Sequence, residues 1–195
     1  GIWIGYEGLS KIGADGGLQT VEWPGNVYDI VDNGVTQVLA SENRGVLLAR
    51  DGKSEVLHDL EAVNLARGLQ GLWIAAGEDG LVGPGGKTYG RAQGLPSDTV
   101  WSAAQHAGDL WVGTEGGLAR LRLDGQGRVV DSMKAGSSPW PAGREAWEVL
   151  PGADGAFFSG PEGVWHLGSP HPQAGSLAVA APVPTIAAGH AAGKT

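Results

Sequence analysis

The feature that most constrains this 195-residue chain is an internal repeat. Segment 110–121, LWVGTEGGLARL, has a strand-like alternation of apolar and polar residues, a tight turn and a second strand-like run. Related segments lie at 2–12, 38–49, 72–83 and 156–167. A repeat of this length indicates one supersecondary unit that is stacked several times, because a single unit cannot bury its own apolar face.

Each repeat combines a large apolar residue with a polar turn that ends in glycine. The large apolar residues are Trp3, Leu39, Trp73, Trp111 and Phe157. The turn glycines are Gly8, Gly45, Gly80, Gly117 and Gly163. We expect a β-hairpin in every unit, with the glycine tolerating a positive φ. We expect the large side chains to fill the space between neighbouring sheets.

A further strand-like run flanks each hairpin on either side. The runs before the hairpins are 27–31, 63–66, 100–104 and 147–150. The runs after the hairpins are 18–23, 54–60, 87–92 and 129–133. Four short antiparallel strands per unit are typical of a β-propeller blade. The sequence therefore predicts an all-β fold, a β-propeller of about five four-stranded blades.

The chain divides into five such units within a single domain, 1–195. Their bounds are 24–60, 61–93, 94–134, 137–180, and a split unit that joins 184–195 to 1–23. Segment 184–195 resembles an inner strand with its turn, and the first residues resemble the second strand of a unit. Pairing these two ends would close the ring without an exposed edge. The alternative is an open five-blade slice of a larger propeller.

Composition excludes several classes of protein. The 35 Gly and 11 Pro approach the composition of disordered chains, but 8 Trp and 42% hydrophobic residues require a folded core. A net charge of −8 without a basic cluster argues against nucleic acid as a partner. The absence of Cys excludes disulfides and thiolate metal sites. No apolar run approaches the roughly 20 residues of a membrane span, so no direct membrane insertion is expected.

Segment 94–121, GLPSDTVWSAAQHAGDLWVGTEGGLARL, resembles the two-component regulator propeller repeat. That repeat combines a Gly-Leu-Pro turn, an inner strand, a glycine-containing turn, Trp-Ile/Val-Gly-Thr and Gly-Gly-Leu. The match is close in this unit, good at 2–12 and 72–83, and weak at 38–49 and 156–167. The resemblance implies an extracytoplasmic, periplasmic sensor part of a bacterial regulator whose signalling domain is a histidine kinase or diguanylate cyclase. These 195 residues contain neither of those partner domains.

The turns between second and third strands carry acidic residues. These are Glu7, Glu42, Glu78 with Asp79, Glu115 and Glu162. If the units superpose, the carboxylates share one face of the disk, where they would attract cations or bind sugar hydroxyls. The alternative is that they are ordinary solvated turn residues.

The start of the inner strand carries a second set of candidate ligand-binding residues. Its aromatic members are Tyr28, Trp101 and Trp147, each directly followed by a polar residue, Asp29, Ser102 or Glu148. Flat aromatic rings beside polar groups suit a carbohydrate or another small polar ligand. The alternative is that the aromatic rings pack between blades.

No catalytic, metal or cofactor motif is evident in the sequence. No two of the five histidines have the i, i+4 spacing of a helical zinc site. Residues 188–195 match a loose phosphate-binding loop, but they fit the repeat as a strand and turn. We therefore predict a non-catalytic recognition domain without a cofactor. The alternatives are a propeller lyase or hydrolase with a His and acid site at the channel mouth, or a protein-interaction propeller anchored by Trp140.

Overall fold

The computed structural model contains only strands, turns and two short 3₁₀ helices in the residues that it describes. The described residues are 2–5, 9–21, 25–32, 37–41, 45–50, 53–69, 71–106, 108–126, 128–132, 144–152, 155–161 and 163–168. The predicted all-β class is confirmed. The strands form several antiparallel sheets, none of which closes on itself.

Five sheets follow one another along the described part of the chain. The first contains β1 (Ile2–Gly5), β2 (Leu9–Ile12) and β3 (Leu18–Val21). The second contains β4 (Val27–Asp32), β5 (Gln37–Ser41), β6 (Gly45–Arg50) and β7 (Lys53–His58). The third contains β8 (Asn64–Gly68), β9 (Gly71–Ala75), β10 (Leu81–Val82) and β11 (Thr88–Tyr89).

The last two sheets repeat this pattern. The fourth contains β12 (Val100–His106), β13 (Asp109–Thr114), β14 (Gly117–Leu123) and β15 (Val129–Ser132). The fifth contains β16 (Glu148–Gly152), β17 (Gly155–Gly160) and β18 (Gly163–Gly168). The short helices η1 (Pro84–Gly86) and η2 (Arg91–Gln93) flank β11. The run predicted at 87–92 is therefore a two-residue strand that continues into a 3₁₀ turn.

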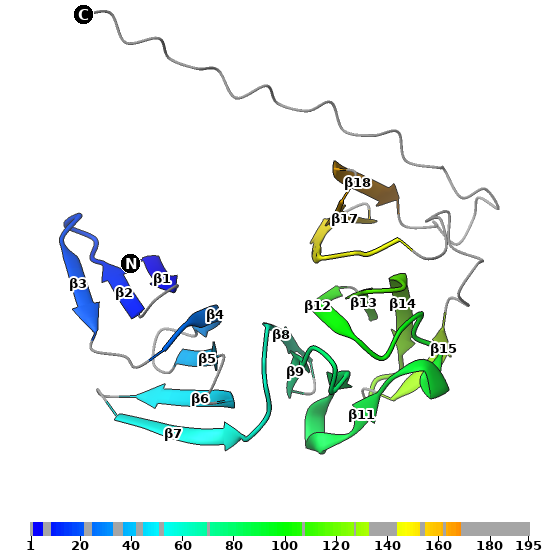
Figure 1. Ribbon diagram of the computed structural model, residues 1–195, viewed down its shortest axis with the longest axis horizontal. Helices are drawn as coiled ribbons and strands as arrows, with labels where there is room; N and C mark the ends of the chain where they lie inside the picture. The colour runs from blue at the N-terminus through cyan, green and yellow to red at the C-terminus, as the bar shows by residue number, and fades with distance from the viewer. Residues whose placement is uncertain are drawn as a thin grey trace, which may run out of the picture.

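The sheets are arranged along an arc, with β4, β8 and β12 on its inner side and β7, β11 and β15 on its outer side (Figure 1). Strand β8 contacts both β4 and β12, and β12 also contacts β16. The register of β1, in which Gly5 pairs with Leu9, matches that of the second strands of the other sheets. The described part of the first sheet thus begins with a second strand, which contacts β4.

Backbone hydrogen bonds join neighbouring sheets as well as strands. Gly77, in the turn after β9, exchanges two hydrogen bonds with Val100 at the start of β12, with N···O distances of 3.1 and 2.8 Å. The Ala146 N–H donates to the Thr114 carbonyl at 2.9 Å and so connects the fourth sheet to the fifth. At these two junctions, the end of a hairpin therefore positions the chain that leads into the inner strand of the next sheet.

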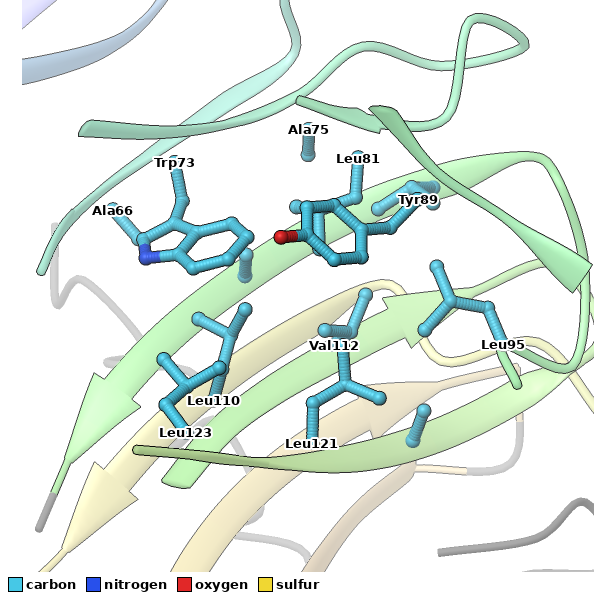
Figure 2. Close-up of a cluster of buried hydrophobic side chains, with 13 residues drawn as sticks. Ala66, Trp73, Ala75, Leu81, Tyr89, Leu95, Leu110, Val112, Leu121 and Leu123 are labelled. Atoms are coloured by element: carbon cyan, nitrogen blue, oxygen red, sulfur yellow. The ribbon is translucent and has the colours of Figure 1, made fainter. Parts of the chain in front are cut away.

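The apolar core lies between the faces of consecutive sheets. Trp73 on β9 is 1% exposed and packs with Tyr89 at 5.4 Å between ring centroids. Both rings face Leu110 and Val112 of the next sheet (Figure 2). Trp111 is buried in the same way against the fifth sheet. The predicted role of the repeated tryptophans between sheets is confirmed at these two positions.

The hairpin register confirms the predicted turns and corrects one apolar position. Gly45, Gly80, Gly117 and Gly163 all have positive φ, from +72° to +129°. Gly8 lies outside the described residues. The ladder places Val38, not Leu39, at the position of Trp73 and Trp111, because the turn after β5 holds one more residue than the turn after β13.

The five sheets fall within the five predicted units. The predicted closing strand, 184–195, lies outside the described residues, as does Trp140. The propeller and its number of blades therefore stay predictions.

Candidate functional site

Four consecutive inner strands carry a polar residue at the same position of the ladder. Asp29 pairs with Ala40, Asn64 with Ala75, Ser102 with Gly113 and Glu148 with Ser159. Each of these partners in turn pairs with the residue that directly follows the hairpin glycine, which establishes the equivalence. The predicted alignment of Asp29, Ser102 and Glu148 is reproduced, and Asn64 completes the set.

The first two of these residues hold three inner strands together. Asp29 Oδ2 accepts hydrogen bonds from Leu65 N at 2.7 Å and from Asn64 Nδ2 at 2.9 Å. Asp29 Oδ1 accepts from Ile30 N at 2.7 Å. Asn64 Oδ1 accepts from Ala103 N at 2.9 Å. This Asp29–Asn64 network therefore runs from β4 through β8 to β12.

A local irregularity of the backbone brings the Asp29 carboxylate to its partners. The β4–β5 register shifts between Val27 and Asp29, so Tyr28 is the extra residue of a β-bulge. A second bulge lies at Trp101, between Val100 and Ser102 of β12. Bulges bend a strand and re-aim its side chains, and they are frequent beside functional sites.

A cavity of about 210 Å³ lies beside the network. Its lining residues are Gly5, Val27, Tyr28, Asp29 and Ile30. It lies where β1 meets β4, and a Cβ atom on Gly5 would lie 2.6 Å from the Val27 carbonyl oxygen. Glycine is therefore required for the two strands to approach each other here. The Tyr28 side chain is 46% exposed.

Two carboxyl groups in this region have raised pKa values. Burial raises the pKa of Asp29, and the hydrogen bonds from Leu65 and Ile30 oppose that rise. Desolvation raises the pKa of Glu148, and the negative charge of Asp29 raises it further. The two carboxylates therefore interact electrostatically, although they lie on different strands, β4 and β16. Two carboxylates that interact in this way create a negative potential, which attracts cations and hydrogen-bond donors.

The other predicted inner-strand residues differ in exposure. Trp101 is half-buried, and its indole nitrogen has no hydrogen-bond acceptor within the described part of the chain. Ser102 is fully buried, and its hydroxyl lacks a partner among the same residues. Trp147 is 47% exposed, and its indole donates to the carboxylate of Glu145. Of the predicted inner-strand residues, Tyr28 and Asp29 line the cavity.

The predicted acidic turns are described in two sheets. Glu78 and Asp79 are exposed in the turn after β9, and Glu115 is exposed after β13. The Ser97 hydroxyl donates to Glu115 Oε2 at 3.3 Å. Glu7, Glu42 and Glu162 lie outside the described residues. Within the described ranges, no three His, Asp or Glu side chains are grouped as a metal site requires.

Asn64 is the functional candidate that sequence reasoning missed. It follows Val63 just as Asp29 follows Tyr28 and Ser102 follows Trp101. Extending the comparison of inner strands to 63–66 would have revealed it, because a polar residue recurs there in every unit compared.

Comparison with solved structures confirms that this fold occurs in signalling proteins. One similar structure is the extracellular domain of the putative one-component system BT4673 from B. thetaiotaomicron, with a TM-score of 0.63 and 18% identity over 84% of this chain. Another is the extracellular domain of the putative hybrid two-component system BT3049 from the same organism, with a TM-score of 0.62 and 15% identity over 89% of this chain. The chain spans 24% and 26% of the length of those two structures.

Comparisons at the level of sequence give no further match. No family model matches the chain, and no curated protein matches it significantly.

Within the described residues, no helix is long and apolar enough to cross a membrane.

Proposed function

We propose that this chain is part of a ligand-sensing β-propeller and that it binds a small polar or carbohydrate ligand beside the Asp29–Asn64 network. The observation that carries the proposal is the set of four polar residues on consecutive inner strands, next to the cavity that Tyr28 and Asp29 line. In this proposal each sheet is one blade, and a fifth inner strand lies between β16 and β4. The similarity to extracellular domains of signalling systems supports an extracytoplasmic, periplasmic location and a sensing role.

The chemistry of the cavity defines the ligand class. Asp29 offers a carboxylate that accepts hydrogen bonds, and Tyr28 offers an aromatic ring that is partly exposed. A sugar presents hydroxyl donors at its edge and C–H groups on its faces, which suits an acceptor beside an aromatic ring. A cavity of about 210 Å³ accommodates part of such a ligand, for example one monosaccharide unit.

The proposed role in signalling follows from the position of the network. A ligand that binds Asp29 contacts the residue that links β4 to β8 and, through Asn64, to β12. Such a ligand would favour one arrangement of these sheets, and the change in population would be passed to the signalling domain of the parent protein. The proposed output partner is a histidine kinase or a diguanylate cyclase. The role is non-catalytic, as it is in a sensor domain.

The experiment is a thermal-shift screen of the 195-residue chain with glucose, galactose, maltose, Ca²⁺ and Mg²⁺. A binding sugar or cation should raise the melting temperature, because it binds the folded state alone. The Tyr28→Ala variant should lose that shift. The control is Leu57→Ala, at a residue 41% exposed on the outer strand β7, which should retain it. A shift that survives in Tyr28→Ala, or the absence of any shift, would contradict the proposal.

A further inference from the structure

A second cavity lies at the opposite ends of the same inner strands. It has a volume of about 460 Å³ and lies between the β8–β9 turn and the β12–β13 turn. Its lining residues are Arg67, Gly68, Leu69, Gln105, His106 and Gly108. Asn64 and Arg67 both belong to β8, so this turn cavity lies roughly 10 Å along the strand from the Asp29–Asn64 network.

The turn cavity carries basic groups in an acidic protein. Arg67 and His106 line it, and none of its lining residues is acidic. Arg67 is exposed and forms no ion pair with another described residue. The adjacent carboxylate of Asp109 is engaged elsewhere, with Arg122 Nε at 3.3 Å and Arg120 Nε at 4.0 Å. The guanidinium of Arg67 is therefore available to a ligand from outside.

The wall of the turn cavity is held in place by its own contacts. Gln105 Oε1 accepts a hydrogen bond from Leu69 N at 3.2 Å, which ties the two turns together. Gly68 packs so closely on Gln105 and Trp73 that a Cβ atom would overlap both side chains. The Trp73 indole nitrogen is buried and has no acceptor among the described residues, and it would lie 2.8 Å from a Cβ atom on Gly68. It is at the end of the ring away from Tyr89 (Figure 2).

We infer that the turn cavity binds a small organic carboxylate. The planar guanidinium of Arg67 suits a carboxylate in bidentate geometry. His106 and the Gln105 amide supply further hydrogen-bonding groups, and Leu69, which is 82% exposed, supplies an apolar contact. A volume of about 460 Å³ is within the range of small-molecule sites. This site is separate from the one proposed at Asp29, and it prefers an anionic ligand rather than a neutral sugar.

The test is isothermal titration of the 195-residue chain with sodium galacturonate, sodium phenylacetate and galactose. Galacturonate and galactose differ in the carboxylate, and phenylacetate distinguishes a sugar acid from a carboxylate of another kind. We expect at least one carboxylate to bind, and galactose to bind at least tenfold more weakly in this cavity. Arg67→Ala should weaken carboxylate binding at least tenfold, because it removes the cation without disturbing the core. Arg91→Ala, at an exposed arginine on η2, is the matched control and should leave binding unchanged.

The location of binding is checked by NMR. The backbone amides of Leu69 and Gln105 should shift on addition of the carboxylate, whereas the amides of Asp29 and Ile30, which line the other cavity, should not. Equal affinity in Arg67→Ala, shifts confined to other residues, or binding of neither carboxylate would overturn the inference. The loss in Arg67→Ala and the positions of the shifted amides do not depend on whether a sugar binds beside Asp29, so the two proposals fail or stand separately.

Discussion

Removing the Asn64 side chain should destabilise the fold far more than its partial exposure suggests. In Asn64→Ala the Ala103 N–H, on a residue that is 4% exposed, loses its acceptor, at a cost of about 1–3 kcal/mol. The charge-assisted hydrogen bond to Asp29 is lost as well, at a further cost of about 1.5–3 kcal/mol. The two costs together span about 2.5–6 kcal/mol, and because Asp29 keeps its two bonds from Leu65 and Ile30, we expect a loss near the middle of that range, about 3–5 kcal/mol.

The assay is thermal and urea unfolding, followed by circular dichroism. For a domain of this size, the loss corresponds to a decrease in melting temperature of roughly 6–20 °C. Gln126→Ala, in an exposed turn, is the control and should change stability by less than about 0.5 kcal/mol. A cycle with Asp29→Ala should give a coupling of about 1 kcal/mol or more between the two side chains. A loss below about 1 kcal/mol in Asn64→Ala, or full additivity in the cycle, would refute the network as a link between sheets.

Two further predictions concern the junction of sheets and the effect of pH. Gly113→Ala should lower the free energy of unfolding by roughly 1–3 kcal/mol in chemical denaturation, because its Cβ would lie 2.6 Å from both the Ala146 carbonyl oxygen and Ser102 Oγ. The control Gly125→Ala meets open space and should leave the free energy of unfolding unchanged. Desolvation and the charge of Asp29 raise the folded-state pKa of Glu148 above its ordinary value of 4.5. The stability that Glu148 contributes is therefore fully present below pH 4.5 and is lost as pH rises through the raised pKa. The difference in unfolding free energy between the native chain and Glu148→Gln should therefore fall over this window, and a rise would show that the sign is wrong.

The strands were largely predictable from the sequence because two independent local signals agree. Period-two alternation marks the strands, and a glycine of positive φ marks each hairpin, as at Gly117 with φ +129°. Both signals lie within about ten residues, so no long-range information is needed. The signal was weaker at 87–92, where η2 replaces most of the expected strand, because a short polar run between glycines fits a 3₁₀ turn equally well.

The sites were less predictable because their groups come from different sheets. The repeat aligned Asp29 with Ser102, but only the structure shows that Asp29 reaches Asn64 on the neighbouring strand. The exposure of Trp101 and Trp147 also differs at equivalent positions, since it depends on what the adjacent sheet places against each ring. The turn cavity had no sequence signal, because Arg67 and Gln105 lie near the ends of the inner strands of consecutive units and form no recognised motif.

The polar residues of the inner strands are difficult to explain by stability alone. A partly buried carboxylate with a raised pKa costs free energy relative to an apolar residue of similar size, and Asp29 recovers that cost only through bonds to Leu65, Ile30 and Asn64. Asp29 and Asn64 also accept hydrogen bonds from backbone N–H groups, but the buried Ser102 hydroxyl has no partner among the described residues, so an apolar residue there would be at least as stable. Polar residues on four consecutive inner strands, of which Asp29 lines a cavity, are therefore better accounted for by the proposed ligand recognition than by packing alone. The argument fails if apolar substitutions there leave every ligand response unchanged.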